Sequence, residues 1–217
     1  MTRNFTFRAT LAHSSHPRIS RTFMLPATST FERLHHTIQF CFGRQNAHVH
    51  EFIIPPKRPS MSDVLIRLGR PQPFEPDESE WGGSPKTIDE RTVGLSAMWD
   101  ERGAYRIPEI REAELDRELR PFRYTYDLGD CWEHEIVVLS SSEADVGDFR
   151  LVQGKGRAPL EGSGGVWRWD ALKDAFAALN PDPEQQDSIE CSRRIAQEGP
   201  DFDPATEPDF TSLNTPG

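Results

Sequence analysis

The sequence predicts an α+β fold in which a largely antiparallel sheet, built from hairpins, packs against two main helices. Short alternating segments occur in pairs, two stretches have helical spacing, and 18 Pro and 15 Gly among 217 residues indicate long irregular connections. We expect one domain over residues 1–217, with surface insertions near 56–90 and 100–120 and an irregular tail from about 199.

Two hairpins are expected from the pattern of the apolar residues. Residues 4–12 alternate apolar and polar side chains, and residues 19–25 repeat the pattern after a turn, which predicts the first hairpin. Residues 122–126 and 132–138 alternate in the same way around a Leu-Gly-Asp turn. A further strand is expected at residues 48–54.

The strongest helical prediction covers residues 30–42. Ser29 and Glu32 have the spacing of a capping box, in which a hydroxyl and a carboxylate satisfy each other's backbone amides. The apolar residues that follow recur every three or four positions. We expect His35 and His36 to lie on or near the solvated side of this helix.

Two more helices are expected in the last third of the chain. Asp170 can cap the second main helix, with Leu172, Ala175 and Leu179 facing inward. A short helix is expected near 184–197.

Charge is distributed unevenly along the chain. The formal net charge is −10, yet the first 60 residues hold eight Lys and Arg against two Glu, and six of the seven His lie within the first 50 residues. This asymmetry favours a basic N-terminal part packed against an acidic remainder. The alternative is nucleic-acid contact through the basic part, although net acidity disfavours broad DNA binding.

Compartment and membrane association are constrained by composition. Cys41, Cys131 and Cys191 are odd in number and far apart, so we expect no disulfide framework and a cytoplasmic location. No apolar run approaches the roughly 20 residues that a membrane-spanning helix needs.

Polar residues of two strand-like segments form the candidate pocket. Such density of polar groups in a hairpin is costly unless the groups are satisfied or used. The candidate residues are His48, His50, Tyr126, Asp127, Asp130, Trp132, His134 and Glu161.

The pocket residues have two interpretations. As a metal site for Zn²⁺ or Mn²⁺, the ligands would be His48, His50, Asp127, Asp130 and His134. As structural groups, the two Asp cap the turn, Gly129 supplies a positive φ, and His134 is a core histidine bonded to one of the Asp. The structural interpretation is favoured.

The chain resembles the plasmid pRiA4b Orf-three-like family over most of its length outside the two insertions. The most specific match is at residues 124–134, Tyr-Thr-Tyr-Asp-Leu-Gly-Asp-Cys-Trp-Glu-His. Relatives usually have Trp in place of Arg44 and an acid in place of Gly162. Further matches occur at residues 17–21, 31–35, 42–43, 48–52, 159–167 and 202–204, and at Asn214.

The resemblance implies a fold and a set of shared polar positions, and it implies no reaction. Some members of the family are passenger proteins of insertion sequences. We therefore expect a cytosolic binding or adaptor module that recognises a protein or a small ligand. The alternatives are a metal-dependent hydrolase and a nucleic-acid-associated passenger protein of a mobile element.

Overall fold

The computed structural model describes residues 2–54, 66–71, 87–99, 121–144 and 146–211. These residues form one eight-stranded sheet in the order β5-β4-β3-β6-β7-β1-β2-β8. The strands are β1 Thr2–Leu11, β2 Ser20–Pro26, β3 His50–Ile54, β4 Ile66–Gly69, β5 Thr87–Asp89, β6 Phe122–Tyr126, β7 Trp132–Ala144 and β8 Arg150–Lys155.

Strand pairing confirms the predicted α+β class. All neighbouring strands are antiparallel except β4 and β5. β1 and β2 form the N-terminal hairpin, with Phe7 opposite Phe23. β6 and β7 form the second hairpin, with Tyr126 opposite Trp132, and β3 lies on the other side of β6 with His50 opposite Tyr126.

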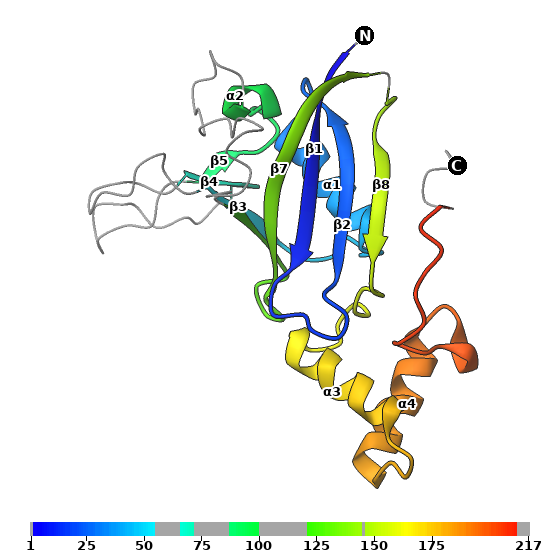
Figure 1. Cartoon of the computed structure of the whole chain (residues 1–217). Coiled ribbons are helices and arrows are strands. Elements are labelled where there is room, and N and C mark those ends of the chain that lie inside the picture. The colour runs from blue at the N-terminus through cyan, green and yellow to red at the C-terminus, as the bar shows by residue number, and fades with distance from the viewer. Residues whose placement is uncertain (1, 55–65, 72–86, 100–120, 145, 212–217) are drawn as a thin grey trace, which may run out of the picture.

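Helix α1, Phe31–Cys41, lies behind the sheet in the view of Figure 1. Its N-cap is Thr30, whose side chain accepts from the Arg33 amide, so the Ser29 capping box was a wrong prediction. His36 is exposed as expected, but His35 is buried. The reason is helical spacing, because His35 is one turn from both Phe31 and Ile38 on the buried face.

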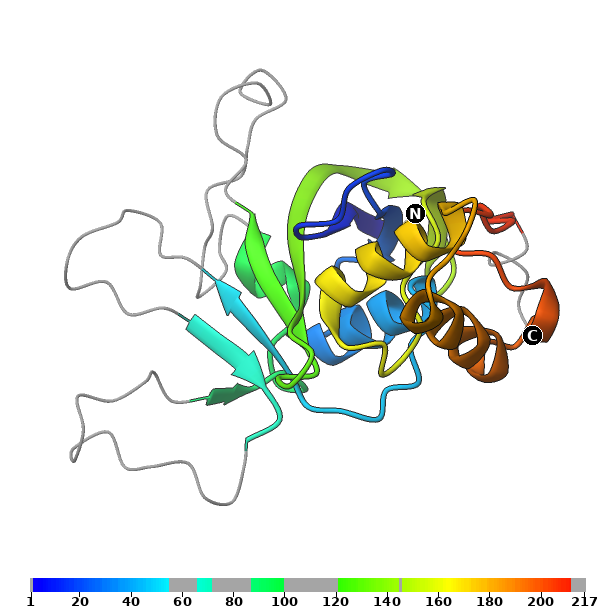
Figure 2. The ribbon, with the colours of Figure 1, turned by 90° about the horizontal axis from the view of Figure 1, so that it is seen from below.

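The remaining helices are α2 Leu95–Trp99, α3 Gly165–Ala177 and α4 Pro183–Ile195, followed by the 3-10 turn η2 Gly199–Asp201. α3 and α4 pack against each other beyond the ends of β1, β2 and β7 (Figures 1 and 2). α3 begins five residues before the predicted cap at Asp170, and Leu179 lies outside the helix with 97% of its surface exposed.

One hydrophobic cluster joins the sheet to α1, α2 and α3. Its central group is aromatic: the Trp99 ring packs on Phe5, Phe7, Phe31 and Phe122. Along β7, Trp132, His134 and Ile136 are buried while Glu133 and Glu135 are not, so the predicted alternation is correct. Among the described helices, none is long and apolar enough to cross a membrane.

One predicted insertion needs a correction. The stretch 56–90 is not irregular throughout, because β4 and β5 lie within it and extend the sheet. In the tail, residues 202–211 are irregular; Phe202 is fully buried, and the Phe210 ring lies where a Cβ on Gly154 would stand. The predicted insertion near 100–120 lies outside the described residues.

Candidate functional site

The segment 44–49, which joins α1 to β3, runs between two groups of polar side chains. It starts after Gly43, which has a φ of 64° as the end of a helix often requires. Its backbone is fixed on β6 and the turn that follows, because the Ala47 amide donates to the Tyr126 hydroxyl and the Asp127 amide donates to the Val49 carbonyl. The segment therefore contributes His48 to one group and residues 46–49 to the lining of the other.

The first group, here named the carboxylate cluster, consists of His48, Tyr126, Asp127 and Glu161. His48 Nε2 lies 3.6 Å from Asp127 Oδ2 and 3.7 Å from Glu161 Oε1. The Tyr126 hydroxyl donates to Glu161 Oε1 at 2.7 Å. Burial and the Glu161 hydrogen bond raise the pKa of Tyr126 to about 12, so this hydroxyl keeps its proton at neutral pH.

Asp127 also builds the turn between β6 and β7. Its Oδ1 accepts from the amides of Gly129 at 3.0 Å and Asp130 at 3.3 Å, which is the predicted Asx-type capping. The positive φ angles of the turn belong to Asp127, at 56°, and Cys131, at 52°, so the expectation of a positive φ at Gly129 was wrong. Asp and Asn tolerate this region better than most residues.

Asp130 points away from His48 and ties the turn to α3. Its Oδ2 accepts from the Gly164 amide at 3.0 Å. A Cβ on Gly165, which has a φ of 85°, would lie 2.9 Å from the Asp130 carbonyl oxygen. Close packing of the two loops therefore requires glycine there.

Beneath the carboxylate cluster lies a buried arginine. The guanidinium of Arg44 stacks on the Trp132 ring, 4.2 Å from its centroid, and only 1% of the Arg44 side chain is exposed. Arg44 NH1 lies 3.8 Å from Glu161 Oε2. Among the described residues, Arg44 Nε and NH2 and the Trp132 indole nitrogen have no hydrogen-bond partner.

His134 is a core residue, as the structural interpretation expected, but it bonds to neither Asp. Its Nδ1 donates to the Trp132 carbonyl at 3.0 Å, and the Phe42 ring packs edge-on against it. Nε2 is buried without a partner. Burial and the nearby Arg44 charge lower the pKa of His134 from 6.5 to about 3, so the ring is neutral.

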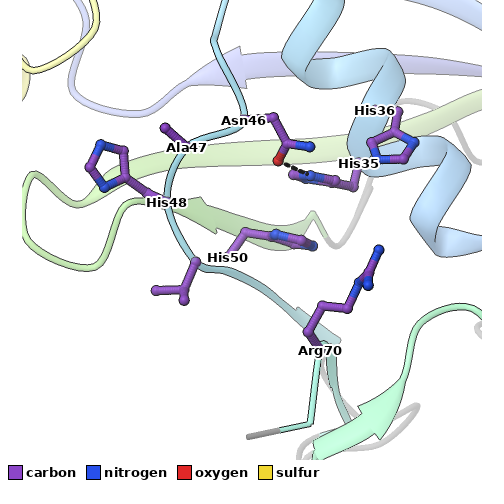
Figure 3. Close-up of a pocket in the computed structure, with 8 residues that line it drawn as sticks. His35, His36, Asn46, Ala47, His48, His50 and Arg70 are labelled. Carbon is purple, nitrogen blue, oxygen red and sulfur yellow. Dashed lines mark hydrogen bonds between the residues drawn. The ribbon is translucent and has the colours of Figure 1, made fainter.

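The second group lines a cavity of about 350 Å³, here named the histidine pocket. Figure 3 shows the stacked rings of His35 and His50 at its centre and His48 pointing away from them. The stacked ring centroids are 3.5 Å apart and the ring planes differ by 5°. The lining residues are His35, His36, Asn46, Ala47, His48, Val49, His50 and Arg70.

A closed circuit of hydrogen bonds fixes His35. His35 Nε2 meets Asn46 Oδ1 at 2.7 Å, and because this oxygen can only accept, Nε2 carries the proton. Burial lowers the pKa of His35 from 6.5 to about 3, so Nδ1 is unprotonated and accepts from the Tyr124 hydroxyl. The Gln39 side chain donates to that hydroxyl through Nε2 and accepts from the backbone amide of Asn46 through Oε1, which closes the circuit.

His50 is held by a buried acid. Its Nε2 donates to Glu90 Oε2 at 2.7 Å, and both side chains are almost inaccessible. The other Glu90 oxygen lies 3.5 Å from Arg70 Nε, and Arg70 NH2 donates to Glu32. The carboxylate of Glu90 thus lies between an imidazole on β3 and a guanidinium just after β4.

The structure divides the eight predicted pocket residues. It brings His48, Tyr126, Asp127 and Glu161 together and places Trp132 beneath them. His50, Asp130 and His134 point elsewhere, so the five residues proposed as metal ligands do not share one centre. Over the described residues, no three His, Cys, Asp or Glu side chains are grouped so as to hold a metal ion.

Sequence reasoning missed several residues of these groups, among them Arg44, His35, Asn46, Arg70 and Glu90. His35 could have been found, because it shares the helical face of the apolar residues. Glu90 and Arg70 follow the strands β5 and β4, in a stretch that was expected to be a surface excursion. Their contact with His50 depends on strand pairing that leaves no local signal.

Comparison with known proteins identifies the family. The model of the family described as plasmid pRiA4b ORF-3-like protein matches residues 3–209. The chain belongs to this family. It is also 33% identical over 172 residues to the uncharacterized protein y4hQ of Sinorhizobium fredii (strain NBRC 101917 / NGR234), covering 78% of this chain and 71% of y4hQ.

The fold of this family member occurs in a solved structure. The crystal structure of the protein of unknown function MM3350 from Methanosarcina mazei Go1 superposes with a TM-score of 0.66. The two chains are 22% identical, and the match covers 94% of this chain and 93% of MM3350. The similarity shows a shared fold, and the relatives' descriptions name no reaction.

Proposed function

We propose that this protein is a binding module that recognises an anionic group, such as a phosphate or carboxylate, in the histidine pocket. The observation that carries the proposal is the chemistry of the lining: His36 and Arg70 offer exposed N–H groups, and no acid is among the eight lining residues. Imidazole, guanidinium and amide N–H groups are the donors with which proteins bind oxyanions.

Pre-organisation supports the proposal. The circuit through Gln39, Tyr124, His35 and Asn46 fixes the pocket wall before any ligand arrives, and a preformed site loses less entropy on binding. The volume of about 350 Å³ lies within the roughly 300–1,000 Å³ typical of small-ligand sites. His36 and Arg70 are exposed enough to meet a ligand, while His35 is committed to the circuit.

The test is a titration with inorganic phosphate at constant ionic strength, followed by ¹H–¹⁵N NMR. Saturable shifts are expected at residues 35, 36, 46–50 and 70. His36→Gln and Arg70→Gln should each weaken binding on the order of tenfold, since a charge-assisted hydrogen bond contributes about 1.5–3 kcal/mol. Unfolding of Arg70→Gln is measured as well, because Arg70 also neutralises Glu90.

Matched controls lie outside the pocket. His13 is exposed with a φ of 60°, which Asn tolerates, so His13→Asn removes an imidazole without disturbing the fold. Arg194→Gln removes an exposed guanidinium from α4. Unsaturable shifts, or equal affinity in the pocket variants and the controls, would contradict the proposal.

The two alternatives from the sequence have less support. A metal-dependent hydrolase lacks a grouped ligand set among the described residues. A rise in melting temperature with Zn²⁺ or Mn²⁺ that is lost in His48→Gln would support the metal-dependent hydrolase. For nucleic-acid contact, four cations of the N-terminal part are buried or paired: Arg21 and Arg44 are buried, and Arg18 and Arg33 pair with Glu135 and Asp148.

A further inference from the structure

The buried guanidinium of Arg44 is under-used within the fold. A guanidinium has five N–H donors, and burying its charge is costly unless they are met. The described contacts of Arg44 are one long hydrogen bond, from NH1 to the Leu160 carbonyl at 3.4 Å, the ion pair with Glu161 and the stacking on Trp132. Nε and NH2 meet no acceptor. Arg44 therefore has donor capacity that Glu161 leaves unfilled.

Glu161 sits in a set of donors suited to a carboxylate. Its Oε1 accepts from the Tyr126 hydroxyl at 2.7 Å, and its Oε2 accepts from the Gln45 amide at 3.4 Å and faces Arg44 NH1 at 3.8 Å. The contacts to Oε2 are longer than the 2.7–2.9 Å of strong charge-assisted bonds. The position thus accepts a carboxylate, and Glu161 fills it loosely.

Glu161 reaches this position from a turn and not from a strand or helix. Residues 156–164 join β8 to α3, and Gly162 and Gly164 within this segment have φ values of 66° and 83°. It is fastened after Glu161 by the Asp130–Gly164 hydrogen bond and internally by Ser163 Oγ donating to the Leu160 carbonyl. Neither fastening involves the Glu161 side chain, of which 14% is exposed.

We propose that the Arg44 guanidinium, the Gln45 backbone amide and the Tyr126 hydroxyl form a carboxylate receptor. Glu161 occupies this receptor as an internal ligand until an external carboxylate replaces it. An external carboxylate in the place of Glu161 accepts from the Tyr126 hydroxyl and the Gln45 backbone amide, and it can approach Arg44 NH1 more closely than the 3.8 Å of Glu161, because it is not tied to the turn. The receptor is separate from the histidine pocket, because none of these three residues lines that pocket. The receptor does not depend on whether the histidine pocket binds an anion.

The first experiment empties the receptor. Glu161→Ala should give a saturable rise in the melting temperature with acetate at constant ionic strength, because a ligand that binds only the folded state stabilises it. The wild type should respond at least tenfold more weakly, since Glu161 competes. Adding Arg44→Met to Glu161→Ala should abolish the response. Glu133→Ala, which removes a carboxylate paired with the exposed Arg123, should behave like the wild type.

A second measurement protects the test if Glu161→Ala does not fold. Glu161→Gln keeps the shape and loses the charge, so acetate should shift the Arg44 Nε–H NMR signal of this variant at lower concentration than in the wild type. An acetate response that is absent in both Glu161 variants, or the same in Glu133→Ala, would overturn the receptor. Either result leaves the phosphate titration of the histidine pocket unaffected.

The source of the carboxylate is decided by three probes on Glu161→Gln: acetate, triglycine and triglycine amide. Equal responses to acetate and triglycine indicate recognition of the carboxylate alone. A stronger response to triglycine indicates a peptide C-terminus, and a stronger response to acetate indicates a small acid. Each of these supports the receptor, whereas binding of triglycine amide as tight as that of triglycine would contradict it.

Discussion

The histidine pocket and the region around Arg44 lie on the two sides of one backbone segment, yet they satisfy their buried polar groups in opposite ways. Around His35, each ring nitrogen has a partner and the hydrogen bonds close on themselves. Around Arg44, the guanidinium, the Trp132 indole and the His134 ring each leave a buried nitrogen without a partner.

This difference separates pre-organisation from unused binding capacity. A fully bonded network gains stability from each bond and loses much when one member is removed. A buried group without a partner already carries its desolvation cost, so its removal costs less stability. We therefore expect substitutions in the first region to reduce the free energy of unfolding more than those in the second.

The largest expected effect is acid destabilisation. The folded-state pKa values of His35 and His134 are lowered from 6.5 to about 3, so the folded protein binds fewer protons than the unfolded chain between these limits. Their contribution to stability is complete above pH 6.5 and decreases as pH falls toward 3. Each should contribute about 1.4 kcal/mol per pH unit, or on the order of 4 kcal/mol together between pH 6.5 and about pH 5.

Urea denaturation across this pH range measures the effect. His134→Leu should remove about half of the slope, and His13→Asn should leave it unchanged. A wild-type slope that His134→Leu does not alter would show that His134 is not held neutral by burial.

The next effect concerns the buried pair of His50 and Glu90. His50→Ala should destabilise the fold by about 3–5 kcal/mol, because it leaves a buried carboxylate with Arg70 as its remaining described counter-charge. The double variant His50→Leu, Glu90→Leu should cost much less, since no charge stays buried. Chemical denaturation measures the free energy of unfolding of both variants. Equal losses of stability in the two would contradict an electrostatic cause.

Tyr124→Phe tests the circuit itself. The hydroxyl donates to His35 and accepts from Gln39, so its loss should cost about 1–3 kcal/mol. Tyr126→Phe is the matched change in the second region and should cost about 0.5–1.5 kcal/mol, because water can reach Glu161. Thermal unfolding of the two variants should rank them in this order, and the reverse order would refute the comparison.

The smallest effect is expected for Arg44→Met, which should change stability by about 1 kcal/mol or less. It removes a poorly satisfied charge and keeps an apolar side chain over Trp132. Arg21→Met is the contrasting control, because the Arg21 guanidinium donates to the carbonyls of Cys41, Ser20 and Lys155. Its loss should exceed about 2 kcal/mol. Equal losses would show that Arg44 is as well satisfied as Arg21.

The sequence by itself determined the hairpins, the first helix, the α+β class and the family. These depend on local alternation, helical spacing and a contiguous motif at residues 124–134, all of which are readable along the chain. It also determined that Asp127 builds a turn, because an Asx hydrogen bond spans only two or three residues. Of the eight residues named as a candidate pocket, the structure brings His48, Tyr126, Asp127 and Glu161 into one group.

Only the tertiary structure decided which polar groups meet across the sheet. His50 faces Glu90 because β3, β4 and β5 pair in register, and Arg44 lies over Trp132 because α1 ends above β7. Contacts between residues 40 or 88 positions apart depend on strand pairing and helix docking, and no local pattern encodes these. The same reason explains why the five predicted ligands lie in four places in the folded chain: His48 with Asp127, His50 at Glu90, Asp130 at Gly164 and His134 in the core.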